Sequence, residues 1–222
     1  MRSEVYNMDC LDYMRGLPDK TFALAIADPP YGININESIG RRKGEKHSGR
    51  KKATWDNVSP SKEFFKELFR VSRQQIIWGA NHFIEKLPRK NASCWLLWDK
   101  KFSDNVDFSQ FEMAWTSFSG MTKKFEKSPS TNEYKFHPTQ KPVALYAWIL
   151  SKYATGGVIF DPMMGSQSSR IAAYKLGFDY VGCELDKEYF DMGCERFNRE
   201  CKGEIKTKSG HIIKEQMLFD YV

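Results

Sequence analysis

Short apolar runs alternate with amphipathic stretches along this chain, a rhythm typical of α/β proteins. The apolar runs predict seven strands, at residues 4–8, 22–27, 75–78, 94–98, 112–116, 158–160 and 180–183. The amphipathic stretches predict helices at 60–72, 142–156, 166–176 and 187–200. The first of these helices carries Phe64, Phe65 and Leu68 on one side and has Ser59 as its expected N-cap. Residues 33–58 and 117–136 show no period, so we expect irregular structure there.

Length and composition narrow the class of protein. With 222 residues, 41% of them hydrophobic, the chain predicts a single domain over 1–222 with a sizeable core. No apolar run approaches the roughly 18 residues of a membrane helix, and the start has no apolar signal core. Five cysteines without a CxxC pair and four scattered histidines predict no metal site. We therefore expect a reduced cytoplasmic protein without membrane contact.

Positive charge is concentrated in one segment. The chain has a formal net charge of +6, and residues 41–52 alone carry the same net charge. This segment has one acidic residue, Glu45, and seven basic residues: Arg41, Arg42, Lys43, Lys46, Arg50, Lys51 and Lys52. A basic loop on a neutral body indicates a polyanion bound at one place. A flexible loop that is merely solvated is an equally open alternative.

A first chemical motif follows the predicted strand at 22–27, where the chain reads Asp28-Pro29-Pro30-Tyr31. Two consecutive prolines stiffen the backbone and remove two N–H donors, which leaves the Pro29 carbonyl free to face a ligand. A carboxylate, a rigid carbonyl and an aromatic ring then lie where open parallel sheets bind ligands. This set suits a flat exocyclic amine, with two acceptors for its N–H bonds and Tyr31 to stack on its ring. A plain proline turn is the structural alternative.

A second motif lies in residues 158–186, which predict a βαβ unit. Asp161 and Pro162 follow the first strand, Gly165 and Ser166 turn into the helix, and Glu184 ends the second strand. The helix N-terminus offers N–H groups to a carboxylate or phosphate, and Glu184 can accept both hydroxyls of a ribose. The sequence HPTQKP, residues 137–142, opens the preceding helix and contains Thr139 and Lys141, which can hold a carboxylate.

Taken together, these motifs resemble the S-adenosylmethionine-dependent amino-methyltransferases, specifically the DNA adenine-N6 group. The DPPY tetrapeptide at 28–31 is similar to the catalytic motif of that family, FDPMMGS at 160–166 to its cofactor loop, and HPTQKP to the segment before it. The catalytic motif precedes the cofactor loop, as in the permuted class called beta. The resemblance implies a three-layer, Rossmann-like α/β fold with circularly permuted motif order. Its sheet would have seven mostly parallel strands, one of them antiparallel.

The cofactor loop departs from the family pattern at one position. The family commonly has Gly-Ser-Gly followed by Thr-Thr, whereas this chain has Gly165-Ser166-Gln167-Ser168-Ser169. Glutamine does not adopt the positive φ of glycine cheaply. We therefore expect the loop to enter the helix directly, with Gln167 already in the first turn. The departure leaves cofactor affinity open.

The resemblance also assigns cofactor contacts. Asp161, Pro162, Gly165 and Ser166 would line the methionine side of S-adenosylmethionine, and Thr139 and Lys141 would face its carboxylate. Glu184 would bind the ribose, Asp9 would accept from the adenine amine, and the Cys10 N–H would reach the adenine ring. Asp12 is the alternative to Asp9. No metal is required.

The implied activity is site-specific methylation of adenine N6 in double-stranded DNA, in the setting of restriction–modification and in a bacterial or phage-infected host cell. The Asp28 carboxylate and the Pro29 carbonyl would accept the two N6 hydrogens and localise the nitrogen lone pair for attack on the sulfonium methyl. The adenine would be flipped out and stacked on Tyr31. We expect residues 33–58 to form a basic mobile loop that clamps phosphates, and residues 99–136 to serve DNA recognition.

Other functions remain open at this stage. An RNA adenine, DNA cytosine-N4 or protein-amine methyltransferase would use a similar pocket, and Gln167 would also fit a DNA-binding module of this fold with weakened catalysis. A dinucleotide-dependent oxidoreductase fits the βαβ unit but not the DPPY turn, and the sequence lacks its GxGxxG motif. The tail at 215–222 faintly resembles peptides that dock on bacterial sliding clamps, although Leu218 and Phe219 can equally pack on the domain. A homodimer, the recognition sequence and a paired nuclease also stay open.

Overall fold

An eight-stranded sheet forms the centre of the molecule in the computed structural model, which describes residues 1–33, 55–88, 93–103, 109–129, 135–206 and 212–214. The strand order is β1-β8-β7-β2-β3-β5-β4-β6, and only β5 runs antiparallel to its neighbours. The strands are β1 (Ser3–Asn7), β2 (Phe22–Ala27), β3 (Ser72–Trp78), β4 (Trp95–Asp99), β5 (Phe111–Thr116), β6 (Lys123–Glu126), β7 (Val158–Asp161) and β8 (Asp179–Glu184). All seven predicted strands are confirmed, and β6 is an eighth strand in the stretch without a period.

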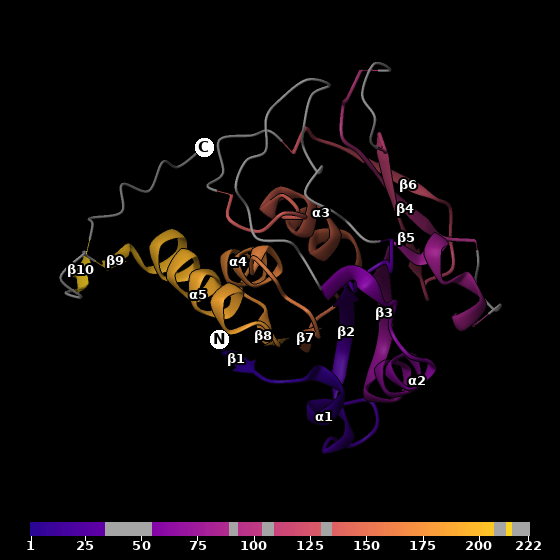
Figure 1. The fold of residues 1–222 in the computed structure, drawn as a ribbon, viewed down its shortest axis with the longest axis horizontal. Coiled ribbons are helices and arrows are strands. Elements are labelled where there is room, and N and C mark those ends of the chain that lie inside the picture. The colour runs from indigo at the N-terminus through magenta and orange to yellow at the C-terminus, as the bar shows by residue number, and fades with distance from the viewer. Residues whose placement is uncertain (34–54, 89–92, 104–108, 130–134, 207–211, 215–222) are drawn as a thin grey trace.

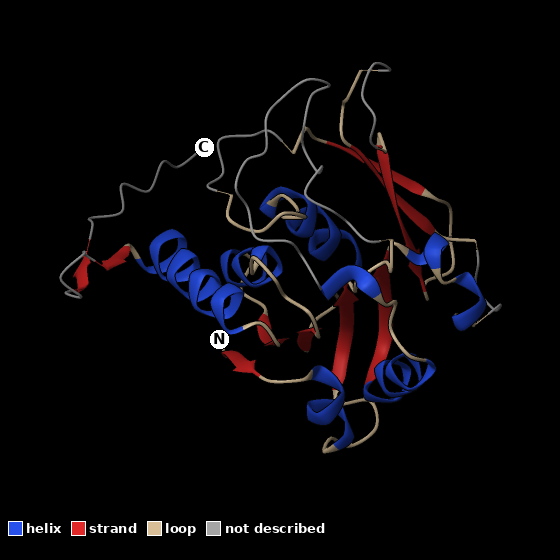
Figure 2. Cartoon of the chain, viewed as in Figure 1, coloured by secondary structure: helices blue, strands red, loops and turns tan. Residues whose placement is uncertain are grey.

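Helices cover both faces of this sheet (Figures 1 and 2). α3 (Val143–Tyr153), α4 (Ser168–Lys175) and α5 (Lys187–Lys202) gather on one side, and α1 (Cys10–Arg15) and α2 (Lys62–Val71) on the other. Side chains alternate along β2, so that Leu24 and Ile26 join the core beneath α3 and α4, while Ala25 and Ala27 join the core beneath α1 and α2. The expected three-layer architecture is therefore present.

The remaining elements are short. Three 3₁₀ turns are η1 (Trp55–Asn57), η2 (Ala80–His82) and η3 (Ile84–Lys86), and a separate hairpin joins β9 (Glu204–Lys206) to β10 (Ile212–Lys214). No helix among the described residues is long and apolar enough to span a bilayer.

The start of α2 differs from the prediction. Ser61, and not Ser59, is the N-cap, because its hydroxyl accepts the Phe64 N–H at 3.1 Å. The Ser59 hydroxyl instead accepts a hydrogen bond from the ammonium of Lys86 at 2.7 Å. Pro60 therefore precedes the helix rather than beginning it.

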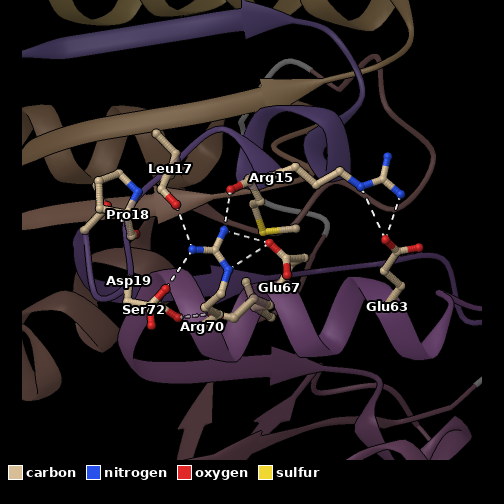
Figure 3. Close-up of polar contacts among 11 residues, drawn as sticks. Arg15, Leu17, Pro18, Asp19, Glu63, Glu67, Arg70 and Ser72 are labelled. Carbon is tan, nitrogen blue, oxygen red and sulfur yellow. Dashed lines mark hydrogen bonds and ion pairs between the residues drawn. The ribbon is translucent and has the colours of Figure 1, made fainter.

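Arg70 joins α2 to the end of α1 (Figure 3). Its guanidinium donates to the carbonyl oxygens of Met14 and Leu17 at 2.8 and 2.7 Å, where the helix end leaves carbonyls without partners in the helix. The same group pairs with the carboxylates of Asp19 and Glu67 at 2.8 and 2.7 Å. These bonds hold together α1 and α2, the helices that pack on one face of β2.

The point where ligands bind in such sheets lies between β2 and β7. These two strands are parallel neighbours, yet the chain leaves them in opposite directions, from β2 through α2 to β3 and from β7 through α4 to β8. A crevice opens beyond the carboxyl ends of strands at such a switch point. The DPPY corner follows β2 there, and the loop that contains Gly165 follows β7. The fold thus brings the two motifs together.

Candidate active site

A cavity of about 420 Å³ lies at this switch point, within the usual size range of small-molecule sites. It unites nearly all the residues that the sequence predicted for catalysis and cofactor binding. Those that line it are Asp28, Pro29, Pro30, Tyr31, Asp9, Cys10, Thr139, Lys141, Pro162, Gly165, Ser166 and Glu184. The residues predicted for catalysis and those predicted for cofactor binding therefore share one space.

Asp28 is held by two side chains of the protein. One carboxylate oxygen, Oδ2, lies 2.5 Å from the Lys141 ammonium, and the Tyr31 hydroxyl donates to Oδ1 at 2.9 Å. The Asp28 side chain is 18% exposed. Burial raises the pKa of Asp28, and the negative charge of Glu112 adds to that rise, whereas the charge of Lys141 acts against it.

Lys141 was predicted to face the carboxylate of the cofactor, and that role stays a prediction. Its ammonium contacts two carboxylates of the protein, Asp28 at 2.5 Å and Glu112 at 3.0 Å, and its side chain is only 2% exposed. Burial alone would lower the pKa of Lys141, but these two carboxylates raise it above its ordinary value. Lys141 is therefore a partner of the DPPY corner in this structure.

The DPPY corner is fixed from behind by Asp56, in the 3₁₀ turn η1. The Asp56 Oδ1 accepts the backbone N–H groups of Tyr31 at 2.7 Å and Gly32 at 3.1 Å. The Tyr31 ring stacks on His82 with a centroid distance of 5.1 Å. It also covers Gly79, where a Cβ would come within 2.0 Å of a ring carbon. The corner is thus rigid before any ligand arrives.

The cofactor end of the cavity is organised by two carboxylates. Glu184 accepts the Gly165 N–H at 2.8 Å and the Asp186 N–H at 2.9 Å, one on each oxygen. Asp9 caps α1 through Oδ1, which accepts the Leu11 N–H at 2.7 Å. Each carboxylate oxygen has a second lone pair, so both groups can still accept from hydroxyl or amine donors.

His137 closes the same end of the cavity beside Gly165. A Cβ at Gly165 would lie 3.3 Å from the His137 Nε2, and Gly165 has a positive φ of 46°. Burial lowers the pKa of His137 to about 4, so the imidazole is neutral at physiological pH. Glycine is therefore needed at this turn for both its conformation and its space.

Asp161 differs from its predicted place on the methionine side of the cavity. The residue is 2% exposed and does not line the cavity. Its oxygens accept the Met163 N–H at 3.1 Å and the Ser169 hydroxyl at 2.5 Å. Burial raises the pKa of Asp161 to about 7. Asp161 therefore shapes the loop after β7 instead of bordering the ligand space.

Gln167 does adopt the glycine-like conformation that we expected it to avoid. It has a φ of 60° and is the N-cap of α4, which begins at Ser168. The cost is offset by its side chain, which is fully buried, donates to the Phe190 carbonyl at 3.2 Å and accepts from Arg170 at 2.8 Å. Gly193 in α5 leaves the space that this side chain fills. The loop thus has a left-handed residue at this position although the residue is not glycine.

The residues at or behind this cavity that escaped prediction from the sequence include Asp56, Glu112 and Lys100, as well as Met8 and Met163 of the cavity wall. Glu112 lies on β5, and its other carboxylate oxygen contacts the Lys100 ammonium at 2.7 Å. An acid in a strand, or one beside a basic loop, has no local signal that distinguishes it from a solvated residue. The basic residues at 41–52 and the tail at 215–222 lie outside the described residues, so their predicted roles stay predictions.

The residues of the cavity fit S-adenosylmethionine. Glu184 and Asp9 offer acceptors to hydroxyl and amine groups, and Met8 and Met163 offer apolar walls. The loop at Gly165 has no side chain to obstruct the space. Among the described residues, no group of histidine, cysteine, aspartate and glutamate could hold a metal ion.

Comparisons with known proteins agree with this geometry. The chain is 25% identical to Type II methyltransferase M2.MboI of Moraxella bovis, with 92% of each chain covered. It is 30% identical to Type II methyltransferase M2.LlaDCHI of Lactococcus lactis subsp. cremoris over 66% of this chain, but spans only 49% of that relative. The solved M1.HpyAVI–SAM complex shares the fold with a TM-score of 0.59 at 20% identity, and 88% of this chain and 98% of that one are covered.

A protein-family model completes the comparison. The model described as DNA methylase, for N6 and N4 methyltransferases, matches residues 85–195, which is half of the chain. The matched region contains HPTQKP and the loop after β7, and the cavity joins both to the DPPY corner. The chain therefore belongs to the N6/N4 DNA methylase family.

Proposed function

We propose that this protein methylates the N6 amino group of adenine in double-stranded DNA, at a specific site and with S-adenosylmethionine as methyl donor. The observation that carries the proposal is that Asp28 and Pro29 line the same cavity as Glu184 and Gly165. Acceptors for an amino group and residues suited to the donor thus meet in one space. When bound, S-adenosylmethionine supplies an electrophilic methyl group.

The DPPY corner would prepare the amino nitrogen for this reaction. The lone pair of an exocyclic amine is delocalised into the ring and is a poor nucleophile. The Asp28 carboxylate and the Pro29 carbonyl would accept its two hydrogens, which localises the lone pair on nitrogen. Fixed acceptors also stabilise the positive charge that develops there. Because Asp56 and Tyr31 already hold the corner, little reorganisation is needed at the moment of reaction.

The adenine would have to leave the duplex to reach this cavity, at a cost of about a few kcal/mol. Tyr31 lines the cavity and offers an aromatic ring for stacking. Contacts of residues 41–52 with phosphates would help offset this cost and would make DNA affinity fall steeply with salt. Residues 99–136 stay our candidates for sequence recognition.

The cofactor contacts follow the walls of the cavity. We assign Glu184 to the ribose, Asp9 and the Cys10 N–H to the adenine of the cofactor, and Gly165 and Ser166 to its methionine side. Pro162 and Thr139 complete this wall. Asp161 would support the loop without touching the ligand, because both of its oxygens bond within the loop and α4.

The test uses the purified protein, labelled S-adenosylmethionine and three duplexes: one complete, one with every adenine replaced and one with every cytosine replaced. Asp28→Ala should abolish transfer and leave cofactor binding, measured by calorimetry, largely intact. Asp191→Ala, an acid-to-alanine change at an exposed position of α5 outside the cavity, is the matched control. Transfer by Asp28→Ala at near the parent rate would refute the role of Asp28.

The labelled product decides which base is the target, because loss of transfer to a base-replaced duplex shows only that the enzyme needs that base. Labelled N6-methyladenine in a nucleoside digest of the complete duplex supports adenine N6. Labelled N4-methylcytosine would establish cytosine N4 instead. Sequencing with modification detection, on DNA from cells that express the chain, would then report the methylated base and its context.

A further inference from the structure

A row of four alternating charges runs behind the catalytic corner. It begins at Asp28, continues through Lys141 at 2.5 Å and Glu112 at 3.0 Å, and ends at Lys100, 2.7 Å from Glu112. The four residues come from the corner after β2, the segment before α3, strand β5 and the end of β4. Asp28 and Lys141 line the cavity, whereas Glu112 and Lys100 stand behind them and do not.

Burying such a row of charges costs free energy, so its presence needs an explanation. A buried ion loses its hydration, and the attraction of its partner often fails to repay that loss. Here every member is less than one fifth exposed, and the Lys141 side chain is 2% exposed. The Tyr31 hydroxyl adds a bridge, because it lies 2.9 Å from Asp28 and 3.2 Å from Glu112. Hydrophobic residues of similar size would fill this place at lower cost.

We propose that Lys141 and Glu112 are positioning residues for the methyl transfer: Lys141 holds the Asp28 carboxylate ionised and in a fixed orientation toward the cavity, and Glu112 holds Lys141 in place. Lys141 binds one oxygen of Asp28 and neutralises its charge. Glu112, balanced by Lys100, keeps the Lys141 ammonium beside Asp28 and away from other anions. The proposal rests on the proposed role of Asp28 as acceptor of the amino hydrogens.

Lys141 and Glu112 have opposite effects on the ionisation of the Asp28 carboxylate. The titratable and charged groups around Asp28 are Lys141, Glu112, Tyr31, Tyr146 and Asp161, with Lys100 behind Glu112. Of these, Lys141 is the cation in direct contact and favours the ionised carboxylate. Glu112 is a second negative charge on the same ammonium and disfavours it.

The experiment measures kcat against pH, the KM for DNA, and the Kd for S-adenosylmethionine by calorimetry. The variants are Lys141→Met, Glu112→Gln and the control Lys175→Met, which removes an exposed lysine in the last turn of α4. Lys141→Met should lower kcat about 100-fold at neutral pH. It should also shift the acid limb of kcat to higher pH by roughly 1–3 units. Its cofactor Kd should stay within about threefold of the parent value.

Glu112→Gln keeps the shape of the side chain and removes only its charge. It should shift the acid limb to lower pH, opposite to Lys141→Met, because the remaining ammonium then favours ionised Asp28 more strongly. Lys175→Met should move neither limb. A purely structural role for the row would not produce shifts of opposite sign, so the sign is the decisive readout.

Several results would overturn the inference. A loss of cofactor affinity of tenfold or more in Lys141→Met, with an unmoved acid limb, would assign Lys141 to the cofactor carboxylate instead. Shifts in the same direction, or none, would also refute it. If Lys141→Met fails to fold, Glu112→Gln alone decides by the direction of its limb. Parent protein that methylates only cytosine refutes the proposed function, yet the same pH comparison still tests the two positioning residues.

Discussion

Gly193 and Gln167 provide a sharp test of how the cofactor loop keeps its shape. Gly193 lies inside α5, where a Cβ would come within 2.6 Å of the Gln167 Nε2 and 2.7 Å of its Cγ. Gln167 cannot withdraw easily, because it is fully buried and bonded to Phe190 and Arg170. Gly193→Ala should therefore push Gln167 out of its place and disturb the loop at Gly165 and Ser166.

The magnitude follows from two opposing effects on the free energy of unfolding. Alanine is favoured over glycine inside a helix by about 1 kcal/mol. Overpacking against a filled space costs about 1–3 kcal/mol. Gly193→Ala should thus be neutral to destabilising by about 2 kcal/mol in the parent. In a Gln167→Gly background the obstruction is gone, and the same change should stabilise by about 1 kcal/mol.

Urea unfolding of the parent, the two single variants and the double variant forms the assay, with equal slopes required for comparison. The coupling between the two sites should reach about 1–3 kcal/mol, beyond the roughly 0.5 kcal/mol scatter of independent sites. If Gly193→Ala stabilises both backgrounds equally, the two residues are independent and the packing argument is wrong.

Three further predictions address the corner, the loop and a helix cap. Asp56→Ala removes the acceptor for the Tyr31 and Gly32 N–H groups, so kcat should fall about 100-fold with little change in cofactor Kd; unchanged kcat would contradict this. Burial raises the pKa of Asp161 from 3.8 to about 7. The protonated Asp161 carboxyl stabilises the folded protein below pH 3.8, and this contribution is lost as the pH rises through 7. Between these pH values the urea midpoint should therefore fall less in Asp161→Asn than in the parent; parallel plots of midpoint against pH would refute this. Ser61→Ala should cost about 1 kcal/mol in urea unfolding, and a value near zero would argue against this cap.

Local patterns predicted a large part of the fold. The strand at Phe22–Ala27 was predicted with its observed bounds, and the other six predicted strands lie within a few residues of theirs. Periodicity and proline or glycine stops act over a few residues, so sequence reads them well. The helix α1 and the strand β6 were missed, because α1 has only six residues and β6 only four. Such short elements show too few repeats of a hydrophobic period to be recognised.

The sequence alone also predicted where the candidate site lies, since motifs at the carboxyl ends of parallel strands must meet at one edge of the sheet. Only the tertiary structure decided which side chains touch. Lys141 contacts Asp28 from 113 residues away, and Asp56 bonds to Tyr31 from 25 residues away. Gln167 adopts its left-handed conformation because α5 leaves a space at Gly193. Such partners depend on how distant elements pack, and a pattern that repeats over a few residues carries no record of that packing.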